Sequence, residues 1–209
     1  MKILNLYAGI GGNRKMWGDE HEVVAVEYDE KIAAVYADLW PKDTLIVGDA
    51  HQYLLDHHHE FDFIWSSPPC QTHSSFRYNI DVRLRGSEEK YPDLSLYEEI
   101  IFLKYHAKEH TLWVIENVVP YYGALLDPVK RNRHLYWSNF ELPEVPKSAE
   151  KLRSMNKISE LEELHGFDLS SHSLPNKRQV LRNVVDPNVG RLFLNAVMNN
   201  KEGEVIEQH

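Results

Sequence analysis

The sequence predicts an α/β fold in which a mostly parallel sheet carries helices on both faces. Short apolar runs alternate along the chain with longer segments of helical periodicity, which is the pattern of βαβ units. A glycine-rich turn follows the first apolar run, and acidic or polar residues stand directly after the others. In an open α/β sheet, ligands bind in the crevice at such strand ends.

The composition is that of a globular protein with one main domain. The chain has 209 residues, and 43% of them are hydrophobic, which supports a core of useful size. No apolar run approaches the ~20 residues of a membrane span, and the N-terminus lacks a signal-peptide pattern. We therefore expect no membrane contact. A single cysteine excludes an internal disulfide, which suits the reducing cytoplasm, where we expect this protein. The formal charge of −9 gives no general attraction toward phosphates, but it does not exclude nucleic acid.

The first unit has the pattern of an adenosine-type cofactor site. We expect a strand at residues 3–7, a tight turn at residues 8–12 and the start of a helix at residues 13–17. A second strand, residues 23–26, ends at Glu27, which lies 18 positions after the first glycine of the turn. That spacing suits an acid that hydrogen-bonds a ribose. A nicotinamide oxidoreductase is the other reading of such a turn.

The next unit brings a second acid to the same edge. Asp29 can cap a helix to about Leu39, and a third strand is expected at residues 44–47. Asp49 follows this strand, so it lies beside the crevice, or else it only forms a turn or a helix cap. Histidines 57–59 are adjacent in sequence and do not converge on one ion as spaced ligands do, so we expect no metal.

Cys70 is the centre of the predicted site. It follows an apolar run at residues 63–65 and the pair Pro68 and Pro69. Proline fixes its own φ and holds the preceding residue extended, so Cys70 leaves the strand on a stiff stalk. A nucleophile there sits where α/β sheets bind ligands. A buried, inert cysteine is the alternative, but the polar residues 71–74 that follow argue against it.

A long polar segment, residues 72–92, separates Cys70 from the next helix, and loops of this length are usually functional. Its candidates for contact with a nucleic-acid strand are Phe76, Arg77, Tyr78, Arg83, Arg85 and Tyr91. Ser95 and Glu98 form a capping box for a helix to about Glu109. A buried strand at residues 112–115 then places Glu116 at its end, on the edge that carries Cys70.

The last third of the chain is less regular. A strand is expected at residues 134–140, after an irregular stretch. Ser159 and Glu162 can cap one short helix, which Gly166 ends. A final helix is expected at residues 186–199, and the residues after it look frayed and acidic.

The order of these motifs resembles the DNA (cytosine-5) methyltransferases. The matching stretches are residues 5–12, Glu27, residues 48–49, residues 67–71, residues 116–118, residues 131–133 and residues 182–187. Several such matches in the family's order are far more specific than any one of them. The sequence departs from the family at Asn5 and Tyr7, where the family usually has aspartate and phenylalanine.

The resemblance implies a Rossmann-like fold of the class I S-adenosylmethionine-dependent methyltransferases. It divides the chain into a catalytic and cofactor-binding core (1–140), a small insert in place of a target-recognition domain (141–176), a segment that returns to the core (177–199) and a flexible tail (200–209). The implied cofactor is S-adenosylmethionine, with S-adenosylhomocysteine as product and no metal. Its expected contacts are Tyr7, Ala8, Gly9, Ile10, Gly11, Gly12, Glu27, Tyr28, Asp49, Ala50, Pro69 and Asn183.

The resemblance also implies a mechanism. The Cys70 thiolate adds to carbon 6 of a flipped-out cytosine while Glu116 protonates N3, which makes carbon 5 nucleophilic. Arg133 is expected to hold the base near its O2, and Arg131 to position that site.

The implied partner is cytosine-containing DNA. The insert at residues 141–176 is short for reading several base pairs, so specificity is expected to be relaxed or supplied by a protein partner. A phage-like or selfish-element origin fits the small size. The alternatives are methyl transfer to single-stranded DNA, RNA or a nucleotide, and a non-catalytic binder with this fold.

Overall fold

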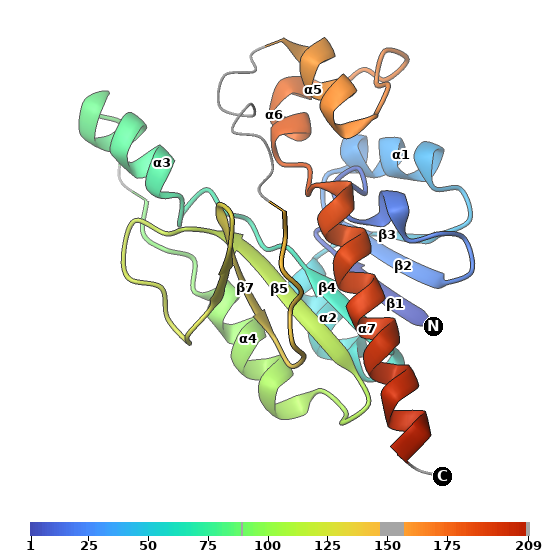
Figure 1. Ribbon diagram of the computed structural model, residues 1–209. Helices are drawn as coiled ribbons and strands as arrows, with labels where there is room; N and C mark the ends of the chain where they lie inside the picture. The colour runs from blue at the N-terminus through green and yellow to red at the C-terminus, as the bar shows by residue number, and fades with distance from the viewer. Residues whose placement is uncertain (89, 147–156, 208–209) are drawn as a thin grey trace.

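The computed structural model describes residues 1–88, 90–146 and 157–207. Within them, one sheet has the strand order β3-β2-β1-β4-β5-β7-β6 (Figure 1). Its strands are β1 (Lys2–Leu6), β2 (Glu22–Glu27), β3 (Thr44–Val47), β4 (Phe63–Ser66), β5 (Leu112–Val118), β6 (Val129–Arg131) and β7 (His134–Ser138). Strands β1 to β5 pair in parallel, whereas β7 pairs antiparallel with both β5 and β6.

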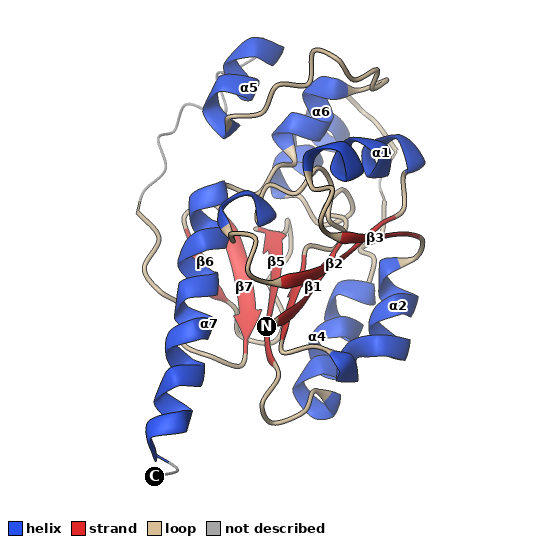
Figure 2. Ribbon diagram, turned by 90° about the vertical axis from the view of Figure 1, so that its right-hand side faces the viewer, coloured by secondary structure: helices blue, strands red, loops and turns tan. Residues whose placement is uncertain are grey.

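Helices cover both faces of the sheet, as the sequence predicts. They are η1 (Arg14–Met16), α1 (Glu30–Leu39), α2 (Ala50–His57), η2 (His58–Glu60), α3 (Ser75–Arg77), η3 (Tyr78–Leu84), α4 (Ser95–His106), α5 (Ile158–His165), α6 (Lys177–Arg182) and α7 (Pro187–Glu207). Helices α2 and α4 pack on one face and α7 on the other, as Figure 2 shows. Among the described residues, no helix is long and apolar enough to cross a bilayer.

Strand β4 illustrates why the central strands are apolar throughout. Its residues Phe63 and Trp65 face α7, whereas Ile64 faces α2 and α4, and all three are fully buried. A strand covered on both faces needs apolar residues at every position. Because β1 lies between β2 and β4, the chain leaves these strands in opposite directions, which opens a crevice at their carboxyl ends.

Strand β5 is longer than predicted. The apolar pattern predicts its end at residue 115, but antiparallel pairing with β7 continues to the pair Val118 and His134. Glu116 therefore lies inside the strand, opposite Tyr136, and not beyond its end. The apolar pattern stops at Glu116, so it gives no sign of this extension.

The predicted capping boxes are wrong. Helix α4 has no side-chain cap at its N-cap residue Leu94; instead, the Asp93 carboxylate accepts a hydrogen bond from the Ser95 amide at 3.1 Å. The same helix ends at His106, before the predicted Glu109. Helix α5 also lacks a side-chain cap, although Gly166 does end it in the left-handed conformation, with φ +66°.

Three further segments differ from expectation. Residues 13–17 form only the short turn η1. The polar segment 72–92 is partly helical, because α3 continues into η3 and projects from the body of the molecule (Figure 1). Helix α7 continues to Glu207, so the backbone of residues 200–207 is helical where a tail was expected.

The described part of the predicted insert packs against the core. Leu161 of α5, with Phe167 and Leu169 after it, buries its side chain in a cluster that includes Ile10 and Val35 of α1. Lys15 donates from Nζ to the carbonyl oxygens of residues 165 and 166, which ties α5 to the start of the chain. This segment therefore covers α1 and the glycine-rich turn. Residues 147–156 of the predicted insert lie outside the described residues.

Candidate active site

The glycine-rich loop, residues 8–12, leaves β1 at the crevice. Its two ends differ in packing: a β-carbon on Gly9 would meet no atom within 4 Å, whereas one on Gly11 would lie 2.3 Å from Trp40 Nε1. Trp40 also donates from Nε1 to the Ile10 carbonyl at 3.0 Å, and the Ile10 side chain is buried beneath the loop. The predicted cofactor residues Ile10 and Gly11 thus form the packed underside, and Gly9 is the open position.

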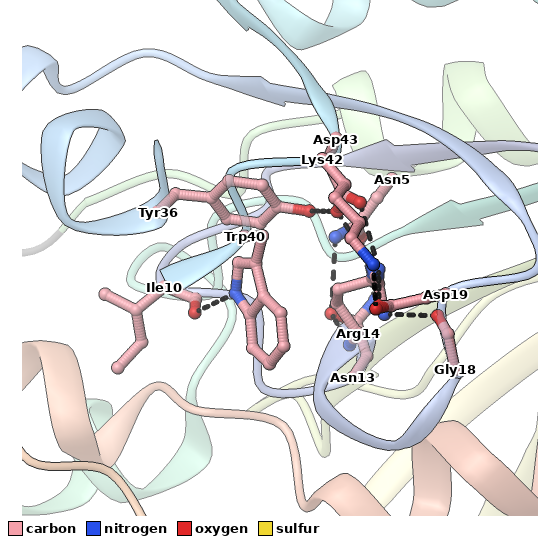
Figure 3. A network of polar contacts seen from close by, with 10 residues as sticks. All are labelled: Asn5, Ile10, Asn13, Arg14, Gly18, Asp19, Tyr36, Trp40, Lys42 and Asp43. Atoms are coloured by element: carbon pink, nitrogen blue, oxygen red, sulfur yellow. Dashed lines mark hydrogen bonds and ion pairs between the residues drawn. The ribbon is translucent and has the colours of Figure 1, made fainter. Parts of the chain in front are cut away.

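The loop rests on a buried polar network, which Figure 3 shows. Arg14 is 2% exposed, and its Nε and Nη2 donate to the two oxygens of Asp43 at 2.8 and 3.0 Å. Its Nη1 donates to the Gly18 carbonyl at 2.8 Å, and Tyr36 Oη donates to Asp43 at 2.8 Å. The Trp40 ring covers the guanidinium at 5.1 Å. The ion pair therefore joins η1, which follows the loop, to the residues between α1 and β3, and Trp40 at the end of α1 holds the loop itself.

Glu27 is joined to the loop directly. One carboxylate oxygen accepts from the Gly9 amide at 2.9 Å, and the other accepts from the Asp29 amide at 2.9 Å. The next residue, Tyr28, is 79% exposed, so its ring stands free at the crevice. Asp49 caps α2 through its carboxylate, which accepts from the amide of His51 at 2.9 Å, and Ala50 is buried behind it.

The C-terminal segment returns to the same loop. The Val185 carbonyl oxygen would lie 2.4 Å from a β-carbon on Gly12, so these backbones are in direct contact. Asn183, two residues earlier, is exposed and accepts from Gln179 Nε2 at 2.9 Å. The structure thus brings the predicted residues Asn183 and Gly12 into one neighbourhood, although they are far apart in sequence.

Cys70 lies on a loop that is anchored on both sides. Before it, Asn117 Nδ2 donates to the Pro68 carbonyl at 3.0 Å, and Pro69 is exposed. After it, the amides of His73 and Ser74 donate to the Cys70 carbonyl at 3.1 and 3.0 Å. Because Asn117 is the neighbour of Glu116 in β5, the strand that carries the predicted acid also holds the loop that carries the thiol.

His73 is a second anchor, which the sequence pattern does not reveal. It is 1% exposed, and its Nδ1 lies 2.5 Å from Tyr122 Oη. Burial lowers the pKa of His73. The backbone of Tyr121 also donates to the His73 carbonyl at 3.0 Å. Hydrogen bonds therefore join the segment that follows Cys70 to the segment that follows Glu116.

The electrostatics of the site keep Cys70 in its neutral form. Burial of the side chain and, second, the negative charge of Glu116 raise the pKa of Cys70 to about 11. Glu116 is 9% exposed, and His134 Nε2 lies 3.6 Å from its Oε1. His134 was not foreseen, because its place beside Glu116 depends on the antiparallel register of β7.

Substituting Glu116→Gln is expected to make Cys70 more reactive. Removing the carboxylate charge lowers the thiol pKa and raises the thiolate fraction, so iodoacetamide should label the protein roughly threefold faster or more at pH 8. Cys70 is the only cysteine, so mass spectrometry reports on it alone, and Cys70→Ala is the unlabelled control. Slower labelling of the glutamine variant would contradict the interaction between these groups.

The paired arginines take different places. Arg131 donates from Nε and Nη2 to the carbonyl oxygens of Pro143 and Leu142, at 3.0 Å each, and pairs with Glu144 at 3.2 Å. These contacts fix Arg131 to the segment at residues 142–144, and its expected role in positioning the base site stays a prediction. Arg133 lies in the turn between β6 and β7 and is exposed. Within the described residues, no group of three acidic, histidine or cysteine side chains is placed to hold a metal.

The fold and the crevice define the class of protein. A mostly parallel sheet with helices on both faces and a glycine-rich loop after β1 is the architecture of the class I S-adenosylmethionine-dependent methyltransferases. The family model of the C-5 cytosine-specific DNA methylases matches residues 1–119, which is more than half of the 209 residues. The chain belongs to that family.

Several solved structures are similar to the chain. DNMT2 of Spodoptera frugiperda is 26% identical with a TM-score of 0.37, and the match covers 56% of this chain and 35% of that one. A hypothetical protein of Thermus thermophilus is 14% identical with a TM-score of 0.45, covering 66% and 73%. The Entamoeba histolytica methyltransferase EhMeth is 13% identical with a TM-score of 0.45, covering 84% and 63%. The chain thus spans about a third of the DNMT2 chain. No curated protein sequence matches it.

Proposed function

We propose that this chain transfers a methyl group from S-adenosylmethionine to carbon 5 of cytosine in DNA, through a covalent bond to Cys70. One observation carries the proposal. The only thiol and a buried carboxylate, Glu116, act on each other electrostatically at the sheet edge that also carries the glycine-rich loop. A protein that only binds a ligand has no need of this pair.

The residues at the crevice fit S-adenosylmethionine. Gly9 leaves open space, so a ligand can approach its backbone closely. The Glu27 carboxylate lies beside Gly9 and can accept a hydrogen bond from a ribose hydroxyl. The exposed ring of Tyr28 suits stacking on adenine, with Asp49 as a nearby acceptor. Asn183 and Pro69 complete the expected contacts. When bound, S-adenosylmethionine supplies an electrophilic methyl group on a sulfonium.

The chain's own residues do the rest. The Cys70 thiolate forms a bond to carbon 6 of cytosine, and the carbon 5–carbon 6 double bond opens toward carbon 5. Glu116 holds a proton at N3, and Arg133 offsets negative charge at O2. After carbon 5 has taken the methyl group, a base removes the carbon 5 proton, the double bond forms again, and the thiolate leaves.

The electrostatic interaction between Glu116 and Cys70 sets the order of the first reaction steps. In the free protein, the Glu116 carboxylate is the second cause of the high pKa of Cys70. When the base binds, Glu116 takes up a proton from solvent and donates it in a hydrogen bond to N3, so the negative charge beside Cys70 is neutralised and the thiol loses its own proton to solvent more easily. The target base therefore helps to activate the nucleophile that attacks it, whereas the empty site keeps an unreactive thiol.

The helical arm of α3 and η3 supports a nucleic-acid substrate. Tyr78 stacks on Tyr121 at 4.1 Å, and the Arg83 guanidinium lies 5.3 Å over the Tyr78 ring. This stack joins the arm to the segment after Glu116. Phe76 is 60% exposed on the same arm, so an aromatic and basic surface stands beside the site.

The described part of the insert is small, which favours a substrate that is recognised without many contacts to base pairs in a DNA groove. Helix α5 and the residues after it bury their apolar side chains against α1, and the part of the insert that the structure describes forms no separate domain. We therefore propose relaxed specificity or recognition by a protein partner, with single-stranded DNA or RNA as the second candidate substrate.

The deciding experiment is transfer of labelled methyl from S-adenosylmethionine to duplex DNA, single-stranded DNA and RNA. Label found as 5-methylcytosine establishes the reaction, and the preferred polymer decides between the two substrates. If S-adenosylmethionine binds but no polymer is labelled, with or without cell extract as a source of partner, the enzymatic proposal fails and the binder is favoured.

The two loop glycines make separate predictions. Gly9→Ala is expected to cost about 1–2 kcal/mol in the free energy of unfolding, because φ is +57°, and to weaken S-adenosylhomocysteine binding about tenfold by filling the open space. Gly11→Ala is expected to destabilise more, by about 2–4 kcal/mol, because its β-carbon meets Trp40. Thermal melts and calorimetry measure both effects. Equal melts for the two variants would contradict the difference in packing.

A further inference from the structure

A buried carboxylate lies beneath the crevice, outside the proposed catalytic groups. Glu99 of α4 is 0% exposed. Tyr7 Oη donates to its Oε1 at 2.6 Å, Ser66 Oγ donates to its Oε2 at 2.7 Å, and His51 Nδ1 lies 3.2 Å from Oε1. A buried carboxylate is stable only with such donors, and short hydrogen bonds to charged groups are among the stronger ones.

The partners of Glu99 come from the segments that carry the proposed site. Tyr7 connects β1 to the glycine-rich loop, and Ser66 ends β4 just before the loop of Cys70. His51 lies in the first turn of α2, directly after the cap that Asp49 forms. One carboxylate therefore fixes the position of the loop, the nucleophile's strand and the α2 cap with respect to one another.

Tyr7 is the partner whose position is hardest to maintain. Its φ is +55°, a left-handed conformation that costs a residue with a side chain about 1–2 kcal/mol. Such a conformation persists when the surroundings hold it in place, and the Glu99 hydrogen bond does so here. Burial first, and then Glu99, raises the pKa of Tyr7 well above its usual value, so the hydroxyl stays protonated and donates.

His51 sets the charge of the cluster. Its hydrogen bond to Glu99 raises the pKa of His51, and the negative charges of Glu98 and Asp49 raise it further. Burial of the ring opposes them and lowers it. The protonated form of His51 is the one that compensates the buried carboxylate, so this contact favours that form. Asp93, before α4, also faces His51.

We propose that Glu99 is a positioning residue for the cofactor, which holds Tyr7 and the glycine-rich loop in the binding conformation with the help of its contact to His51. The inference rests on the proposed function, because it takes the loop to bind S-adenosylmethionine. The proposed mechanism gives Glu99 no chemical role, so positioning is the role that explains why this carboxylate is fully buried.

Calorimetric titration with S-adenosylhomocysteine tests the role of the hydrogen bond. We expect Tyr7→Phe and Glu99→Gln to weaken binding about tenfold each, and the double variant to add little to either, since both remove one interaction. The matched controls are Glu109→Gln, which removes an exposed carboxylate charge just after α4, and Tyr53→Phe, which removes a hydroxyl from α2. Both should stay within about twofold of the unchanged protein.

The pH dependence separates positioning from general stability. Because the pKa of His51 is raised in the folded protein, its contribution is present at low pH and is lost as pH rises through that pKa. Affinity should therefore fall as pH rises through the raised pKa of His51, and His51→Gln should remove this fall. The pKa values of Cys70 and Tyr7 are raised above their already higher ordinary values, and that of His73 is lowered, so these groups titrate apart from His51.

The outcomes distinguish the two proposals. If the unchanged protein does not bind S-adenosylhomocysteine, the proposed function fails. If it binds, but Tyr7→Phe binds equally well, or His51→Gln keeps the same pH dependence, the role of Glu99 is overturned. Tyr7→Phe retains the ring, so it keeps the test decisive if Glu99→Gln does not fold.

Discussion

Replacing Cys70 with alanine is expected to lower methyl transfer by about a thousandfold or more, because no other group can form the bond to carbon 6. Binding of S-adenosylhomocysteine should stay within about twofold of the unchanged protein, since Gly9 and Glu27 contact each other and not Cys70. Single-turnover transfer and calorimetry on the same samples measure the two quantities. The separation of these effects is the signature of a nucleophile beside an intact cofactor site.

A trapped adduct tests the same step independently. Cytosine with fluorine at carbon 5 can form the bond to Cys70 and take the methyl group, but it has no carbon 5 proton to lose, so the thiolate cannot leave. The protein should then gain the mass of the oligonucleotide and one methyl group, and Cys70→Ala should gain none. An active alanine variant, or an adduct at another residue, would contradict the assignment of Cys70.

Replacing Asp43 with alanine is expected to lower the free energy of unfolding by about 3–5 kcal/mol. Arg14 is 2% exposed, and loss of Asp43 would leave its guanidinium buried without its bidentate partner. For a chain of this size, the melting temperature should fall by roughly 6–20 °C. Thermal unfolding followed by circular dichroism measures the change.

Asp19→Ala is the matched control, because Asp19 lies 3.5 Å from the same guanidinium but its side chain is 61% exposed. An exposed partner contributes little, so we expect a loss far smaller than that of Asp43→Ala. Equal losses for Asp19 and Asp43 would show that burial does not set the strength of this ion pair.

Much of the fold follows from short-range patterns. The apolar run at residues 63–65 predicts a buried strand, and the glycines at residues 8–12 predict a tight turn. Both features depend on residue types that are close in sequence. Gly166 likewise ends α5 where it was expected to. The capping box predicted for α4 is wrong because Asp93, placed by the chain that precedes the helix, accepts the hydrogen bond from the Ser95 amide instead.

The candidate site was only partly predictable. Cys70 and Glu116 stand out by residue type and position in sequence, and the structure brings them within electrostatic reach. His134 and Glu99 do not stand out, because their importance arises from strand register and from a helix face that meets three other segments. Long-range pairing of this kind leaves no local trace in a single sequence.

The long pairing of β5 also divides the site into a stiff part and a compliant part. Strand β5 pairs with β4 as far as Ile115 and with β7 through Val118, so Glu116, opposite Tyr136, lies in a strand whose opening requires much of the sheet to open with it. Cys70 sits on a turn held by a few hydrogen bonds, whose local opening costs far less. Any adjustment to the shape of an arriving base must therefore come from the thiol's side, while the acid serves as the fixed reference.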